Sequence, residues 1–343
     1  MRKGATLSRR AAHAAMSPRH RKEAMTRHHK VFSDILAKPK ALDLVDTAVV
    51  WPLSDVALQG AMQALGEQLI RPILIGPRRE ICALARGLDL DLKGAEIVDA
   101  ADEAQAAATA VALCATGRAE MLMKGSLHTD QFMRAVLDDA TGLKTHRRIS
   151  HVFVLDVPSY PRVLMITDAA INIYPDLMEK ADIVQNAIDL AHVLGLPNPR
   201  VAILSAVETV TPKIRSTIDA AALCKMADRG QITGGVLDGP LAFDNAVSLK
   251  AARIKRISSP VAGRADILVV PDLESGNMLA KQLEYLADAE AAGIVLGARV
   301  PIVLTSRADS AKSRLASCAV AVLLAHDRRA RPGGLPAAGA HHV

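Results

Sequence analysis

Residues 301–326 combine residue types that suit the binding of a phosphate-like anion. Residues 301–304 form a short apolar run, 305–310 are polar, and apolar residues then recur at helical spacing. A strand, a loop and a helix start in this order aim free backbone N–H groups and the positive end of the helix dipole at an anion. Arg307 adds a charged donor to that loop. The alternative is that Asp309 or Ser310 only caps the helix and that Arg307 is a solvated loop residue.

Polar residues also follow four other apolar runs of the chain. These are Lys124 and His128 after 120–123, Asp168 and Asn172 after 162–167, Asp238 and Asp244 after 235–237, and Asp272 and Asn277 after 267–270. Ligand sites of α/β sheets form outside the carboxyl ends of the strands, so such residues are predicted to border one. The alternative roles are helix caps for the aspartates and a hydrogen-bonded loop position for His128.

Several familiar chemistries lack their sequence signature. The chain contains no G-x-G-x-x-G fingerprint, no Gly-Lys pair of a P-loop, no H-E-x-x-H motif and no G-x-S-x-G elbow. Its four cysteines lie far apart, without zinc-type spacing. The remaining chemistry is anion binding by arginine, lysine, histidine and helix starts.

Apolar runs of strand length alternate with helical patterns along most of the chain, which predicts an α/β fold with a largely parallel sheet. From about residue 150 the pattern changes. Runs at 151–157 and 162–167 are separated by a Pro-containing turn and predict an antiparallel pair, after which the alternation resumes. We therefore place a domain boundary near residue 150, between two closely connected α/β lobes.

The charge of the chain is concentrated in its tails. The net charge is +6, yet residues 1–30 hold nine Lys or Arg against one acid, which leaves the body acidic. With three Tyr, four Phe and one Trp, platforms for stacking bases are scarce, so nucleic-acid binding is not expected of the fold. No apolar run is long enough to span a membrane, and the scattered cysteines and lack of an export leader predict a cytoplasmic protein.

Five segments in order resemble the phosphate acetyl/butyryl transferase family. They are L-M-K-G-S-L-H-T-D (122–130), T-D-A-A-I-N-I-Y-P-D (167–176), V-L-D-G-P-L-A-F-D-N-A (236–246), S-P-V-A-G-R-A-D-I-L-V-V-P-D-L-E-S-G-N-M-L-A-K (259–281) and P-I-V-L-T-S-R-A-D-S (301–310). The likeness covers nearly all of residues 40–326, and the wording of two segments looks closer to the butyryl branch.

The resemblance implies that acyl-CoA and inorganic phosphate are converted to acyl phosphate and CoA. It implies a ternary complex without metal, bound cofactor or covalent enzyme intermediate, with CoA as a substrate. The implied fold is two three-layer α/β/α lobes around a cleft, similar to the isocitrate dehydrogenase architecture, in a homodimer. The expected domains are 31–150 plus 299–326 and 151–298, with a basic, disordered arm at 1–30 and a flexible tail at 327–343.

The same resemblance assigns roles to particular residues. Arg307 and Arg134 match family arginines that suit phosphate or an oxyanion, and Ser306 matches a serine that hydrogen-bonds in the transition state. The aspartate expected seven residues after that serine falls on Ser313, so Asp309 is the substitute candidate for the general base. The predicted substrate-binding residues are Lys124, His128, Thr129, Arg134, Asp168, Asn172, Gly263, Asn277 and Lys281, and no metal ligands are predicted.

Two other classes of function compete with this hypothesis. One is a metal- and NAD-dependent decarboxylating dehydrogenase of the related architecture, which requires clustered aspartates around a divalent ion. The other is a non-catalytic regulatory or interaction protein on this scaffold, including a nucleic-acid binder that acts through residues 1–30.

Overall fold

The computed structural model describes residues 30–304 and 309–330. Outside the described residues lie residues 1–29 of the arm predicted at 1–30, the catalytic candidates Ser306 and Arg307, and the end of the predicted tail. Among the helices that are described, none is long and apolar enough to cross a membrane.

The first lobe alternates strands and helices as the sequence predicts. Ser54 and Asp102 fix two of the helix starts, because their side chains accept the backbone N–H groups of Ala57 and Gln105. After α2 (Lys30–Ala37) and η1 (Lys38–Ala41), the elements are β1 (Val45–Val50), α3 (Asp55–Gly66), β2 (Ile70–Ile75), α4 (Arg78–Gly87), β3 (Glu96–Val98), α5 (Glu103–Ala115), β4 (Met121–Lys124) and α6 (Thr129–Val136).

The second lobe opens with the antiparallel pair predicted from the turn at 158–161. Two short helices adjoin at Ser248, whose backbone is extended and whose side chain caps the second of them. The elements are β5 (Ser150–Asp156), β6 (Leu164–Thr167), α7 (Leu177–Val193), β7 (Arg200–Leu204), α8 (Arg215–Asp228), β8 (Val236–Leu241), α9 (Phe243–Val247), α10 (Leu249–Ile254), β9 (Ile267–Val269), α11 (Leu273–Leu286) and β10 (Glu290–Leu296).

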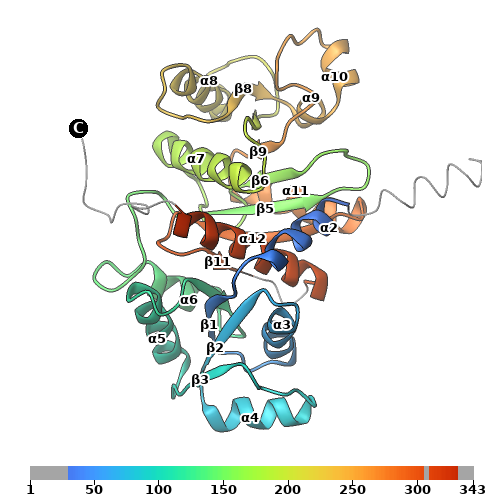
Figure 1. The fold of residues 1–343 in the computed structure, drawn as a ribbon. Coiled ribbons are helices and arrows are strands. Elements are labelled where there is room, and N and C mark those ends of the chain that lie inside the picture. The colour runs from blue at the N-terminus through green and yellow to red at the C-terminus, as the bar shows by residue number, and fades with distance from the viewer. Residues whose placement is uncertain (1–29, 305–308, 331–343) are drawn as a thin grey trace, which may run out of the picture.

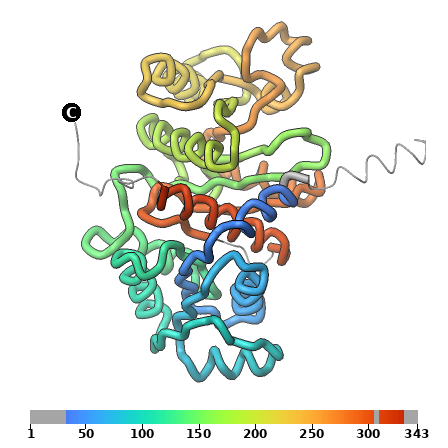
Figure 2. The backbone as a smooth tube through the Cα atoms, viewed as in Figure 1, coloured from blue at the N-terminus to red at the C-terminus, as the bar shows by residue number. Residues whose placement is uncertain are grey.

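The chain then returns to the first lobe. β11 (Ile302–Val303) pairs in parallel with β4, and α12 (Ala311–Ala330) continues past residue 327, where the tail was expected to begin. Figures 1 and 2 show α12 crossing the middle of the molecule beside α2, so the first and last described helices lie together.

All strands described belong to one sheet, in the order β3-β2-β1-β4-β11-β10-β5-β6-β9-β7-β8. β10 is antiparallel to both β11 and β5, and β5 is antiparallel to β6. Three reversals separate the parallel strands of the first lobe from those of the second. The strands β4 and β11 therefore point in the opposite direction to β6 and β9, although the register places Met123, Val303 and Thr167, near the carboxyl ends of β4, β11 and β6, in one row across the sheet.

The two faces of the sheet are packed differently. On the face covered by α12, one apolar cluster runs through both lobes, from Val49 and Met123 to Val152 and Val201. On the other face the core is divided, with one cluster around Leu122 and Phe132 in the first lobe and a second around Leu155 and Ile166. On this second face, neither apolar cluster covers the sheet where the two lobes meet, so polar groups can occupy that position.

Candidate active site

The segment after β4 is held tightly against the end of β1. A side chain at Gly125 would place its Cβ 2.3 Å from the Val50 carbonyl oxygen, so only glycine fits there. The ammonium of Lys124 donates to the carbonyls of Gly125 at 3.1 Å and Leu127 at 3.0 Å. This fixes the charge of Lys124 at the start of the loop that leads into α6.

The residues that follow Lys124 are open to solvent. His128 occupies the N-cap position of α6 without a side-chain cap bond, and both it and Thr129 are exposed. Arg134, two turns along α6, is exposed and lines a pocket of about 420 Å³ between α5 and α6. These three side chains are exposed and therefore available to a ligand.

Asp168 and Asn172 form a buried polar group at the carboxyl end of β6. Each is 3 % exposed. The Asp168 carboxylate accepts backbone N–H groups from Ala170 at 2.9 Å and Ile171 at 3.1 Å, together with the side-chain amide of Asn172. Burial raises the pKa of Asp168, and these hydrogen bonds oppose that rise. The geometry makes the pair a brace for the loop after β6.

Helix α11 runs from this brace toward the loop that follows β11. Asp272 caps the helix, and the side chain of Asn277 donates to the Ala169 carbonyl at 3.3 Å. Further along, the Lys281 ammonium pairs with Glu284 at 2.6 Å and lies 6.0 Å from the ring centre of Phe153. Burial opposes the charged form of Lys281, but the bond to Glu284 and the negative charge of Asp309 raise its pKa. Lys281 therefore lies close to the loop that carries the catalytic candidates.

Only Asp309 of the three catalytic candidates is described. Its backbone carbonyl accepts a hydrogen bond from Arg314. The neighbouring Ser313, where the family acid was expected, is buried, and its backbone N–H donates to the Ser310 side chain at 3.0 Å. Its hydroxyl lies 3.1 Å from that same side chain, so position 313 serves the start of α12.

Gly263 is placed by backbone geometry. Its φ is +78°, and a Cβ there would lie 2.5 Å from the backbone of Leu249, so glycine is required. Its N–H donates to the Asn245 carbonyl at 2.7 Å. These contacts join the connection before β9 to α9 and α10, and none of them involves another predicted site residue.

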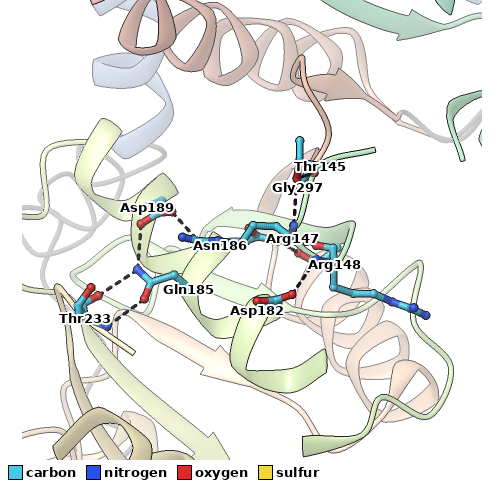
Figure 3. A network of polar contacts seen from close by, with 10 residues as sticks. Thr145, Arg147, Arg148, Asp182, Gln185, Asn186, Asp189, Thr233 and Gly297 are labelled. Carbon is cyan, nitrogen blue, oxygen red and sulfur yellow. Dashed lines mark hydrogen bonds and ion pairs between the residues drawn. The ribbon is translucent and has the colours of Figure 1, made fainter. Parts of the chain in front are cut away.

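A basic segment that the sequence reasoning missed lies where the lobes meet. The guanidinium of Arg148 donates to the Asn172 side chain at 2.7 Å and pairs with Glu179 at 2.9 Å, and Arg147 pairs with Asp189 on α7. Figure 3 shows Arg147 beside Asp189, and the further contacts of the Arg148 backbone with Asp182 and Asn186 on α7. Together with residues such as Met178 it borders a pocket of about 580 Å³. The only signal in the sequence was the Arg-Arg pair directly before the lobe boundary.

Comparison with known proteins gives consistent likenesses over most of the chain. The family model for phosphate acetyl/butaryl transferase matches residues 103–322. A phosphate acetyltransferase of Rhizobium meliloti is 63% identical over 299 residues, 87% of this chain and 95% of that protein. A phosphate butyryltransferase of Clostridium acetobutylicum is 42% identical over 299 residues, 87% of this chain and 99% of that protein. The expected closeness to the butyryl branch is not reflected in these identities.

Solved structures of other proteins also match most of the chain. A branched-chain phosphotransacylase from Enterococcus faecalis V583 has a TM-score of 0.73 at 33% identity, over 82% of this chain and 99% of that one. A 4-hydroxythreonine-4-phosphate dehydrogenase from Klebsiella pneumoniae has a TM-score of 0.50 at 12% identity, over 83% and 100%. The second likeness concerns the fold alone, and it agrees with the predicted α/β architecture.

Proposed function

Because the chain belongs to the phosphate acetyl/butyryl transferase family, we propose that it transfers an acetyl group between coenzyme A and inorganic phosphate. The observation that carries the proposal is the 63% identity to a phosphate acetyltransferase over 87% of the chain. The identity to a butyryltransferase is lower, at 42%, so we take acetyl-CoA rather than butyryl-CoA as the preferred acyl donor. CoA acts as a substrate, and the reaction uses no metal ion or permanently bound cofactor.

The first task of the site is to bind phosphate and stabilise the charge that develops on the acyl carbonyl oxygen. Arg307 and Arg134 have planar, permanently charged donors that suit both anions. The hydroxyl of Ser306 donates a hydrogen bond to the reacting group without becoming acylated. Lys124, held at the start of the α6 loop, and the exposed His128 and Thr129 bind the anionic substrate at the same end of the sheet.

The second task is to handle the proton of the CoA thiol. A carboxylate near the sulfur can accept that proton when CoA attacks and return it when CoA leaves. We assign this role to Asp309, since Ser313 carries no carboxylate and its backbone and hydroxyl serve the start of α12. The negative charge of Asp309 is one of the causes that raise the pKa of Lys281, so the two groups lie close enough to interact.

Two broader properties follow the same proposal. Exposed apolar side chains on α11, namely Met278, Tyr285 and Leu286, support a homodimer, which light scattering of the purified protein measures. The thiols of Cys82, Cys114, Cys224 and Cys318 form no disulfide, which supports a cytoplasmic location.

The test mixes acetyl-CoA with phosphate and follows the release of free thiol. Arg307→Ala is expected to lower kcat by roughly two to three orders of magnitude, the range for loss of one oxyanion donor. The matched control is Arg86→Ala, which removes an exposed arginine at the end of α4. The proposal fails if no phosphate-dependent thiol release occurs with acetyl-, butyryl- or hexanoyl-CoA. NAD reduction that EDTA abolishes would favour the dehydrogenase instead.

A further inference from the structure

The imidazole of His151 is a buried polar group whose burial the fold does not explain. His151 lies on β5 with 1 % of its surface exposed. Its Nδ1 atom has no hydrogen-bond partner among the described residues. Buried side-chain nitrogens almost always have a partner, so an unpaired one indicates a ligand or a special role.

The fold makes room for this ring in a specific place. A Cβ at Gly293 on the neighbouring β10 would lie 2.9 Å from the Nε2 atom of His151 and 3.2 Å from the carbonyl oxygen of Leu304. The ring also meets Phe153 edge-on, with 4.4 Å between the ring centres. His151 therefore lies beside the last described residue before the loop of Ser306 and Arg307.

This position is the junction between the lobes. Its neighbour Phe153 is partly buried and packs against the apolar cluster around Leu155 and Ile166. The Lys281 ammonium lies 6.0 Å from the centre of that same phenyl ring. A partner for Nδ1 can therefore come from a molecule that enters between the lobes.

The ring is neutral in these surroundings. Burial lowers the pKa of His151 to about 3, and the positive charge of Lys281 adds to the effect. The other charged group nearby is Asp168, whose carboxylate is bonded by the backbone of His151. A neutral imidazole keeps one N–H donor at neutral pH, and such a donor can polarise a carbonyl without changing its charge.

We propose that His151 is a further catalytic residue, whose Nδ1–H group donates a hydrogen bond to the carbonyl oxygen of the bound acyl thioester. This inference rests on the proposed acetyl transfer. A phosphate oxygen attacks the carbonyl carbon and forms a C–O bond, while the carbonyl electron pair moves onto the oxygen that His151 holds. The pair then returns, the C–S bond breaks, and the CoA sulfur leaves with the electrons and gains, by way of Asp309, the proton released by phosphate.

The test compares His151→Leu with His151→Asn. Leucine removes the donor, whereas the amide nitrogen of asparagine reaches the position of Nδ1. We expect His151→Leu to lower kcat by about 100-fold or more, and His151→Asn to recover at least tenfold of that loss. KM for phosphate stays within about twofold in both variants, because the donor acts on the acyl carbonyl. The control is His192→Leu. It removes a histidine in the last turn of α7 that is hydrogen-bonded to the Gly234 carbonyl.

Gly293→Ala supplies a second, independent measurement. The new methyl group displaces the ring, so Gly293→Ala is expected to lower kcat when it is the only change. In a His151→Ala background the same change should lower kcat little further, because no ring remains to be displaced. Circular dichroism checks the fold of each variant. If wild type is active and His151→Leu keeps kcat within twofold, the role of His151 is refuted while the proposed function stands. If wild type releases no thiol, the proposed function itself fails.

Discussion

Replacing His151 by leucine is expected to remove part of the acid sensitivity of the fold. The pKa of His151 is lowered from 6.5 to about 3 by burial, so the unfolded chain takes up a proton at a higher pH than the folded one. The contribution of the neutral ring to the free energy of unfolding is fully present above about pH 7 and decreases as the pH falls from 6.5 toward 3. Each pH unit in that range removes about 1.4 kcal/mol, which amounts to about 2 kcal/mol at pH 5.

Urea unfolding at pH 7.5 and pH 5.0 measures this difference. Wild type should lose about 2 kcal/mol more between the two pH values than His151→Leu, since all other titrating groups are shared. His192→Leu, which leaves His151 in place, should keep the larger wild-type loss. Equal losses in wild type and His151→Leu would mean that the ring is solvated or charged in the folded protein, and the reasoning from its burial would be wrong.

Two further predictions concern buried groups away from the junction. Lys180→Met removes the buried ionic partner of Asp219 and leaves its carboxylate paired with the exposed Arg215. We expect this variant to lower the free energy of unfolding, measured in urea, by about 3 kcal/mol. A change below about 1 kcal/mol would contradict a buried ion pair. Burial raises the pKa of the Cys114, Cys224 and Cys318 thiols to about 12. A thiol reagent at pH 8 should therefore label Cys82 alone in the native protein, and mass spectrometry identifies the labelled site. Rapid labelling of Cys318 would contradict the packing of α12.

The sequence predicts the local elements well because their signals are local. Caps such as Ser54 and Asp102 and the turn at 158–161 act within a few residues. Strand β10 gives a weak signal, since its small residues and Gly293 have little strand propensity, and its partners β5 and β11 are brought to it by the fold. The antiparallel direction of β10, which decides where the strand ends lie, therefore could not be read from the pattern.

The candidate site was predictable only as far as motifs carry it. Lys124 and Asp309 stand in recognisable segments, Arg134 follows one of them by four residues, and the structure leaves all three near or at the surface. His151 and Arg148 lie in a segment without an obvious motif, and their importance depends on burial and on partners distant in sequence. The role of Asp168 as a buried brace likewise depends on backbone N–H groups that the fold supplies.

Helix α11 is the element that unites the site. The ends of β4 and β6 lie in one row of the sheet, but β11, β10 and β5 stand between them. Lys124 and Asp168 are therefore about four strand spacings apart, roughly 19 Å, which is too far for one small ligand to contact both. Helix α11 begins at Asp272 beside the Asp168 brace and reaches Lys281 near Asp309, and its 14 residues span about 20 Å. A phosphate ion alone would use only one end of that length. An acyl-CoA, with its reactive thioester at one end of a long arm, matches a site that extends along the helix, which is the physical reason to keep both groups of residues in the proposed substrate site.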